Sequence, residues 1–317
     1  MASPLPSLVK AATPAPAVLV EDLRKSYGAT RVLDGLSFAA QRGRVTALLG
    51  PNGAGKTTTV ACCEGLQRPD TGRLRVLGLD PVADVEQLRP RVGVMLQDGG
   101  LPTGVGALEA LRHVAGLHTR PLPVDALAER LGLTSFARTR VRRLSGGQRQ
   151  RLAVACALVG RPELVFLDEP SAGLDPQARL AVWDVVREAR ASGVAVVLTT
   201  HLMEEAERLA DDVVVIDAGR VVAQGTPEDL TRGPAVLTFA ARPGLPTESL
   251  RLALPVDADV VEGEPGHYAV LGIPADPRVA ATVTSWCATH DVLPEGLGAQ
   301  RRTLEDVFLD LTGRSLR

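Results

Sequence analysis

The fold of this chain is decided by the stretch Gly50-Pro51-Asn52-Gly53-Ala54-Gly55-Lys56-Thr57-Thr58. Residues 50–57 fit the pattern G-x-x-x-x-G-K-S/T, in which successive backbone N–H groups surround phosphate oxygens at the start of a helix. Lys56 is then expected to reach the β- and γ-phosphates of a nucleotide, and the Thr57 hydroxyl to help hold Mg²⁺. The loop predicts a nucleotide-binding α/β domain, although kinases, GTPases and motor proteins share it.

Apolar runs on both sides of this loop predict a parallel sheet with an antiparallel sheet beside it. Short runs broken by turn residues over 18–49 suggest antiparallel strands that lead into a buried strand, and a helix is expected over 57–63. Runs at 164–167, 194–199 and 213–216 suit buried parallel strands, with a helix at 177–191 between the first two. Alternating strands and helices of this kind indicate an α/β core.

Two other regions have a different character. Residues 99–160 contain helical patterns at 107–115, 124–131 and 148–159 and no convincing strand, which predicts a helical subdomain. From about residue 233, prolines punctuate short elements in the order β-α-β-β-α-β, the ferredoxin-like pattern, before a last amphipathic helix that begins at Thr303. We therefore expect a flexible tail over 1–17, the main domain over 18–232 and a small α+β accessory domain over 233–317.

Two carboxylates follow the apolar run at 164–167. Asp168 and Glu169 would stand at the carboxyl end of a buried strand, which is where an open α/β sheet places ligand chemistry. Asp168 is then suited to support Mg²⁺, and Glu169 to orient or deprotonate the water that attacks the γ-phosphate. Carboxylates after a strand are usually only solvated, but the phosphate loop in the same chain favours the catalytic interpretation.

The segment Leu144-Ser145-Gly146-Gly147-Gln148 precedes the helical pattern at 148–159. Ser145 and the two glycine amides are therefore expected at a helix N-terminus, a second place that favours an anion. Taken alone, the segment would equally suit a serine N-cap followed by a glycine turn. Together with the phosphate loop and the two carboxylates it matches the signature sequence of ABC ATPases as it stands, and the chain resembles that family.

This resemblance covers about residues 18–229 and implies the fold of an ABC cassette, a P-loop NTPase with a helical subdomain. By resemblance, Tyr27 stacks on adenine and Gln97 links Mg²⁺ and water to a membrane partner. Asp175 lies in the loop that crosses to a second protomer, and His201 contacts the γ-phosphate. The implied catalytic residues are Lys56, Glu169 and His201, the implied Mg²⁺ ligands are Thr57, Gln97 and Asp168, and the implied ATP contacts are Tyr27, Gly50, Pro51, Asn52, Gly53, Ala54, Gly55, Lys56, Thr57, Thr58, Gln97, Ser145, Gly146, Gly147, Gln148, Asp168 and Asp175.

The resemblance also implies partners. Cassettes of this family pack head to tail in pairs, so that the Ser145 segment of one copy closes over the nucleotide held by residues 50–58 of the other. The run at 304–312 resembles the tail of the bacterial ABC-2 subfamily, whose cassettes serve exporters of drugs, antibiotics, polysaccharides or lipids. A second copy of the chain and a separate ABC-2 type permease are the implied partners, and drug-resistance ATPases are the nearest likeness.

Three alternatives differ from this interpretation in what they predict. An import cassette would carry the same motifs, and only the tail argues against it. A non-transport ABC ATPase acting on DNA or ribosomes would predict tandem cassettes, a long coiled-coil insertion or a basic face, none of which the sequence displays. A small-molecule kinase would leave the Ser145 segment and His201 without a purpose.

Composition limits the partners and the location. The net charge of −2 and the pI near 6.2 give no general attraction to phosphate backbones, so no nucleic-acid partner is expected. No stretch approaches the roughly 18 consecutive apolar residues needed to span a bilayer. We expect a cytoplasmic protein, held peripherally at the inner face of the membrane by its permease. Four histidines match no motif and are expected to be structural or superficial: His113, His118, His267 and His290.

Overall fold

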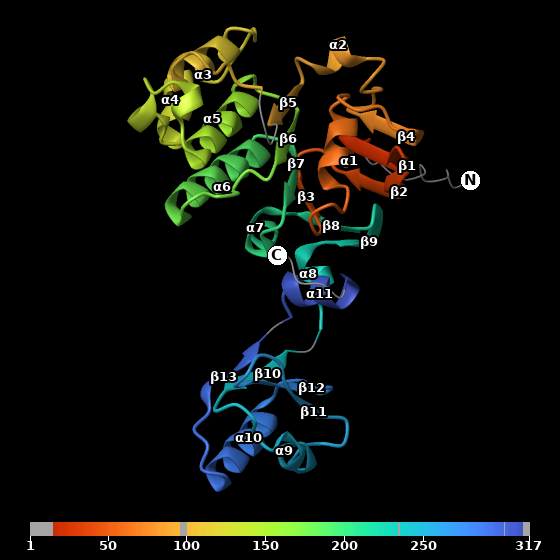
Figure 1. Ribbon diagram of the computed structural model, residues 1–317, viewed down its shortest axis with the longest axis vertical. Helices are drawn as coiled ribbons and strands as arrows, with labels where there is room; N and C mark the ends of the chain where they lie inside the picture. The colour runs from red at the N-terminus through yellow and green to blue at the C-terminus, as the bar shows by residue number, and fades with distance from the viewer. Residues whose placement is uncertain (1–14, 96–99, 234, 301, 313–317) are drawn as a thin grey trace, which may run out of the picture. The chain divides into compact units, whose positions relative to one another are not determined.

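The structure, a computed structural model, describes residues 15–95, 100–233, 235–300 and 302–312 (Figure 1). The chain divides into two compact units, one running to Pro227 and the other spanning Glu228–Gly313. The division falls a few residues before the boundary that the sequence suggested after residue 232. The phosphate loop, the Ser145 segment, the two carboxylates and His201 all belong to the first unit, whereas the run at 304–312 belongs to the second.

A six-stranded sheet forms the centre of the first unit, in the order β5-β6-β7-β3-β8-β9. Neighbouring strands from β5 to β8 are parallel, and β9 pairs antiparallel with β8. Strands β3, β6 and β7 are buried along their whole length, which explains their continuous apolar runs. The bounds are β3 Val45–Leu49, β5 Val92–Met95, β6 Leu164–Asp168, β7 Ala195–Thr200, β8 Asp212–Asp217 and β9 Arg220–Gly225.

A three-stranded antiparallel sheet lies beside this core. Its strands are β1 (Val18–Tyr27), β2 (Thr30–Ala40) and β4 (Thr71–Val76), with β1 in the middle. Helix α1 (Lys56–Cys63) packs against β2, β4 and β6, and one apolar cluster joins the two sheets through residues such as Leu33 and Phe166. The predicted combination of a parallel core and an antiparallel subdomain is confirmed.

Helices cover the rest of the first unit, and residues 100–160 contain three α-helices and two 3-10 helices but no named strand, in agreement with the predicted helical subdomain. Helix α6 begins where Pro176 follows Asp175, whose Oδ1 accepts a hydrogen bond from the Ala178 N–H at 2.8 Å. The bounds are α2 Val85–Leu88, α3 Ala107–Ala115, α4 Val124–Arg130, α5 Gly146–Val159, α6 Pro176–Ala191 and α7 Met203–Leu209, with 3-10 helices at Leu133–Phe136 and Val141–Arg143. Helix α8, Pro227–Leu230, spans the boundary between the two units in the sequence.

The start of the first unit corrects one expectation. The predicted tail over 1–17 lies mostly outside the described residues, but Ala17 is fully buried and its N–H donates to the Ala40 carbonyl at 2.8 Å. The folded domain therefore begins before Val18. Within the described residues no helix is both long and apolar enough to cross a membrane.

The second unit follows the β-α-β-β-α-β order over its described part. Its sheet has the strand order β11-β12-β10-β13, all antiparallel, and its core contains Phe239 stacked on Tyr268 with ring centroids 5.2 Å apart. A final helix, α11, starts at Leu304, one residue after the predicted start at Thr303. The bounds are β10 Val236–Ala240, α9 Thr247–Ala253, β11 Asp259–Glu262, β12 His267–Leu271, α10 Pro277–Thr289, β13 Glu295–Gln300 and α11 Leu304–Thr312.

Candidate functional site

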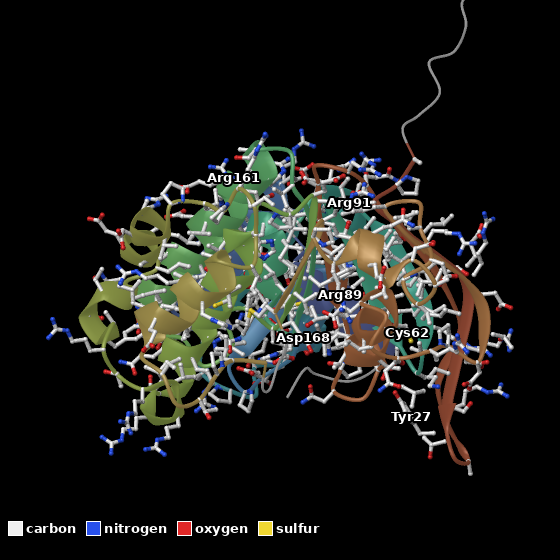
Figure 2. The ribbon with its side chains drawn as sticks, turned by 90° about the horizontal axis from the view of Figure 1, so that it is seen from above. Tyr27, Cys62, Arg89, Arg91, Arg161 and Asp168 are labelled. Atoms are coloured by element: carbon white, nitrogen blue, oxygen red, sulfur yellow. The ribbon has the colours of Figure 1, made fainter. Side chains whose placement is uncertain are left out.

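The carboxyl ends of three adjacent parallel strands define the site. Leu49 at the end of β3 is level with Thr200 at the end of β7, and Asp168 at the end of β6 is level with Thr199. The segments that follow these strands therefore emerge at the same edge of the sheet. In Figure 2, Asp168 lies at this edge, while Arg161 lies beyond the opposite end of β6. This is the place where open α/β sheets bind ligands.

The phosphate loop between β3 and α1 leaves no room for side chains at two of its glycines. A Cβ on Gly50 would meet the Ile216 carbonyl oxygen at 2.2 Å, and a Cβ on Gly55 would meet Leu33 Cδ2 at 2.6 Å. Gly55 also has a φ of 104°, which favours glycine, and it serves as the N-cap of α1 without a capping side chain. The first N–H groups of α1 are left for an anion.

Lys56 lies at the start of α1 and bends back over the loop. Its Nζ donates to the Gly50 carbonyl at 2.7 Å and to the Pro51 carbonyl at 3.1 Å. Burial lowers the pKa of Lys56, while the negative charges of Glu169 and Asp168 oppose that effect. The lysine therefore lies close enough to both carboxylates for their negative charges to act on it.

Asp168 is almost completely buried at the end of β6. Burial raises its pKa, and hydrogen bonds from Thr199 and Thr57 oppose this. The Thr199 hydroxyl donates to Asp168 Oδ1, so the side chain is held from the neighbouring strand. Thr57 and Asp168, two of the expected Mg²⁺ ligands, therefore lie side by side.

Glu169 is held at the site by an unusual backbone conformation. Its φ is 51°, a left-handed value that costs energy for any residue with a Cβ. The Glu169 N–H donates to the Thr199 carbonyl at 3.1 Å and to the Thr199 hydroxyl at 3.0 Å. Its Oε1 lies 3.2 Å from Nδ1 of His201. The predicted base and the predicted γ-phosphate contact are thus brought together.

The Ser145 segment forms the N-terminus of α5. Ser145 Oγ accepts from the Gln148 N–H at 3.2 Å, and the Gln148 side chain accepts from the Ser145 N–H at 3.0 Å, which makes a capping box. The sequence placed the start of this helix at Gln148, whereas it begins at Gly146. Across the described part of the chain, no hydrogen bond or ion pair joins this segment to the phosphate loop.

The remaining predicted contacts are placed differently. Asp175 serves as the N-cap of α6, and Tyr27 ends β1 with 47% of its surface exposed and Lys25 Nζ 5.5 Å from its ring centroid. Neither side chain contacts the phosphate loop in any described interaction. Gln97 lies outside the described residues.

Two residues with contacts to the site were not identified from the sequence. Gln150 of α5 donates through Nε2 to the Glu169 carbonyl, and Thr199 holds both carboxylate residues. Thr199 could have been found, because a hydroxyl within a fully buried strand needs a partner. Gln150 gave no such signal, since it stands between two arginines in a helix.

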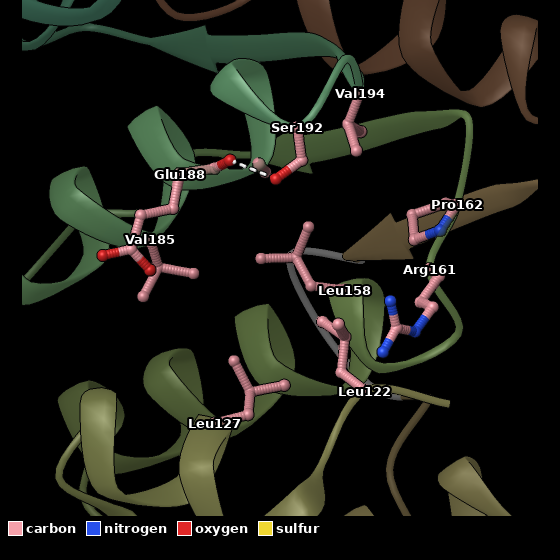
Figure 3. Close-up of a pocket in the computed structure, with 10 residues that line it drawn as sticks. Leu122, Leu127, Leu158, Arg161, Pro162, Val185, Glu188, Ser192 and Val194 are labelled. Atoms are coloured by element: carbon pink, nitrogen blue, oxygen red, sulfur yellow. Dashed lines mark hydrogen bonds between the residues drawn. The ribbon is translucent and has the colours of Figure 1, made fainter. Parts of the chain in front are cut away.

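A separate hollow of about 330 Å³ lies between α4, α5 and α6 (Figure 3). It is lined mainly by apolar side chains, including Leu122, Leu127, Leu158 and Val185. Arg130 of α4 pairs with Glu188 of α6 and joins the helical region to the core. None of the predicted site residues lines this hollow, so the loop at residues 50–58 remains the candidate anion site.

Comparisons with known proteins agree with this geometry. The family model described as "ABC transporter" matches residues 33–172. Nod factor export ATP-binding protein I of Ralstonia nicotianae is 42% identical over 312 residues and covers 95% of both chains. Daunorubicin resistance ATP-binding protein DrrA3 of Streptomyces coeruleorubidus is 39% identical over 315 residues, which cover 95% of this chain and 97% of that one.

Solved structures of ABC transporter subunits also match this chain. A structure of an ATP-binding subunit of an ABC transporter matches with a TM-score of 0.62 and 33% identity, over 68% of this chain and 92% of that one. The subunit cbiO1 of Clostridium perfringens, part of the ABC transporter complex cbiONQ, matches with a TM-score of 0.58 and 30% identity, over 68% and 90%. With relatives aligned along nearly its whole length, this chain belongs to the ABC transporter family as one of its ATP-hydrolysing, ATP-binding subunits.

Proposed function

We propose that this chain is the ATPase subunit of an ABC-2 type exporter, in which two cassettes drive a separate membrane permease. The observation that carries the proposal is the meeting of the phosphate loop, Asp168, Glu169 and His201 at one edge of the sheet. The names of the two relatives above, which concern Nod factor export and daunorubicin resistance, support export rather than import.

In this proposal the loop at residues 50–58 holds the phosphates of ATP. Backbone N–H groups at the start of α1 face the β-phosphate, and Lys56 exchanges its two carbonyl partners for phosphate oxygens. Tyr27 is exposed at the end of β1 and available to stack on adenine. Each of these assignments follows the family motif at the matching position.

The residues present also fit Mg²⁺. Thr57 and Asp168 place a hydroxyl and a carboxylate next to each other, and burial penalises the carboxylate charge. Mg²⁺ is usually held by one or two carboxylates together with substrate phosphates, so a larger cluster of acidic ligands is not needed. We assign Thr57, Asp168 and Gln97 to this ion, which would neutralise charge that develops on the phosphates.

We assign the hydrolysis step to Glu169 together with His201. The carboxylate of Glu169 is placed to accept a proton from the attacking water, a role generally worth about 10²–10⁴ in rate. His201 Nδ1 lies 3.2 Å from Glu169 Oε1, and in this proposal His201 orients that carboxylate and contacts the γ-phosphate. The hydrogen bonds that the Glu169 N–H donates to the Thr199 carbonyl and hydroxyl fix the backbone of Glu169 before the substrate arrives.

The second half of the site comes from another copy of the chain. The N-terminus of α5 lies at Ser145, Gly146 and Gly147 and is capped within its own segment. In the described structure it makes no hydrogen bond to the phosphate loop of the same chain. Two cassettes packed head to tail would place this segment on the γ-phosphate held by residues 50–58 of the partner copy, with the Asp175 loop crossing beside it. Closure and separation of the pair then form the two-state element that a permease senses.

Hydrolysis and dimerisation test the site directly. The purified chain should release phosphate from ATP only with Mg²⁺ present, with a rate that rises more than linearly with protein concentration. Lys56→Ala should abolish release, and Arg112→Ala, an exposed change on α3, serves as the matched control for lost positive charge. A rate that is strictly proportional to protein concentration would contradict the paired site.

The partner and the direction of transport need separate experiments. Affinity purification from detergent-solubilised membranes should recover a multi-spanning permease, and recovery of ribosomes or DNA-repair proteins would overturn the transport proposal. In proteoliposomes with the cassettes outside, added ATP should drive substrate into the lumen if the complex exports. Movement of substrate out of the lumen would identify an importer instead. This arrangement would hold the chain peripherally at the inner face of the membrane.

A further inference from the structure

A buried polar cluster lies behind the site, where the loop after Glu169 meets the segment that carries His201. Its members are Ser171 of that loop, Trp183 of α6 and Glu205 of α7, each at most 1% exposed. None of the three has a role in the nucleotide site as proposed. Their burial calls for a reason, since an unpaired carboxyl in the interior costs several kcal/mol.

One carboxylate oxygen gathers the hydrogen bonds of the cluster. Glu205 Oε1 accepts from the Ser171 hydroxyl and, at 3.0 Å, from Trp183 Nε1, which also lies 3.0 Å from Ser171 Oγ. Burial raises the pKa of Glu205, and hydrogen bonds from Ser171, Thr200 and Trp183 oppose this. The cluster therefore joins a loop, two helices and the end of β7 through a single side chain.

The cluster is connected to both hydrolytic residues by short stretches of chain. Ser171 follows Glu169 by two positions, and the Ala172 N–H donates to the Glu169 carbonyl at 3.1 Å. On the other side, the Thr200 hydroxyl accepts from the Leu202 N–H at 2.9 Å, and the Glu205 N–H donates to the Leu202 carbonyl at 3.1 Å. His201 stands between Thr200 and Leu202, so the Glu205 segment fixes its backbone.

Apolar side chains could fill this space between α6 and α7 with less desolvation cost, and such replacements of buried charged groups are often neutral or stabilising. Hydrogen bonds differ from apolar contacts in having a preferred direction. We propose that Glu205 is a positioning residue, which locks the Ser171 loop to the His201 segment so that Glu169 and His201 keep their relative position on one γ-phosphate. The inference rests on the proposed function of the site.

The test compares two substitutions of Glu205 in the full-length chain. Glu205→Gln retains an oxygen acceptor of the same shape, whereas Glu205→Leu removes it. We expect Glu205→Leu to lower kcat about tenfold or more with less than about a twofold change in the KM for ATP, and Glu205→Gln to stay within about threefold of the original kcat. Glu204→Gln is the matched control, because that exposed neighbour undergoes the same change of charge.

Trp183→Phe provides a milder second variant, in case Glu205→Leu does not fold. It removes one N–H donor and keeps an aromatic ring, and we expect kcat to fall about threefold with the KM unchanged. A purely structural cluster would lower the temperature of unfolding but leave kcat of the folded chain unaltered, which would overturn the proposal. Equal loss of kcat in Glu205→Gln and Glu205→Leu would overturn it too.

The same measurements separate this proposal from the proposed function. An original chain that hydrolyses no ATP under any condition contradicts the proposed ATPase site itself. A chain that hydrolyses ATP equally well with glutamate or leucine at position 205 contradicts only the positioning role.

Discussion

Glu169 Oε1 lies 3.2 Å from His201 Nδ1 although the two residues are 32 positions apart in the chain. They meet because β6 and β7 are adjacent parallel strands that end at the same level. The contact depends on the order of these strands and on the backbone of the segments that follow them. Each partner can therefore be changed separately to ask which step it serves.

We expect Glu169→Gln to leave ATP binding intact and to lower turnover by at least about 10²-fold, the usual share of a general base. Glutamine has the same length and can keep a hydrogen bond to His201. ATP should then trap the pair, which gel filtration with ATP and Mg²⁺ would detect as a dimer. Persistent turnover, or a monomer under these conditions, would contradict the assignment of Glu169 and the paired site.

Gln150→Ala tests the hydrogen bond from α5 to the Glu169 carbonyl. The Glu169 carbonyl keeps the Ala172 N–H as a partner, so the variant loses one hydrogen bond, worth about 0.5–1.5 kcal/mol. We expect kcat to fall by about threefold to tenfold as Glu169 loses this support. Nucleotide affinity, measured with a fluorescent ATP analogue, should change little. Gln87→Ala, an exposed change on α2, is the control. An unchanged kcat in Gln150→Ala would show that the contact has no part in turnover.

Gly50→Ala tests the steric limit of the phosphate loop. The new Cβ would stand 2.2 Å from the Ile216 carbonyl oxygen, which belongs to β8 and cannot move freely. Overpacking of this kind typically costs about 1–3 kcal/mol, so the temperature of unfolding and the affinity for ATP should both fall. Gly104→Ala is the control, because its Cβ would meet no heavy atom within 4 Å. Equal stability of the two variants would mean that the loop can shift without cost.

Glu64, the C-cap of α1, should make stability depend on pH. Burial, with a smaller contribution from the charge of Asp168, raises its pKa from 4.5 to about 8. The folded chain then binds the proton more tightly than the unfolded chain, so the free energy of unfolding should fall as pH rises from about 4.5 to about 8. The slope from this group is at most about 1.4 kcal/mol per pH unit.

Urea unfolding at several pH values between 5 and 9 would measure this slope. Glu64→Gln removes the titrating group, and we expect the decline in stability over this range to become shallower by comparison with the original chain. Glu86→Gln, an exposed change on α2, should leave the slope as it was. A slope that is identical in the original chain and in Glu64→Gln would mean that Glu64 is solvated when folded.

Much of the site was predictable because its residues follow strong local patterns. The loop at residues 50–58 and the two carboxylates come directly after buried apolar runs, and parallel strands with short buried runs end at one edge. The start of α5 was misplaced because glycine is a poor helix former, so the pattern seemed to begin at Gln148. The capping box between Ser145 and Gln148 outweighs that tendency.

Other features of the site could not be predicted from short stretches of sequence. The left-handed conformation of Glu169 is imposed by its backbone contacts to β7, not by its own preference. The Gln150 contact and the cluster around Glu205 depend on where α5, α6 and α7 pack, which no short stretch of sequence specifies. In both cases the polar residue looks like part of an exposed helix face until its partner is known.

Because α5 is long, a small tilt of its end beside the hollow would shift its other end, at Ser145, by a larger distance. The helix has 14 residues and is therefore about 21 Å long, with Ser145 before one end and Leu158, part of the hollow's lining, near the other. As a rigid lever of that length, it would move Ser145 by roughly 2 Å for a tilt of about 5° at the hollow. A displacement of that size is enough to form or to break a hydrogen bond made by Ser145.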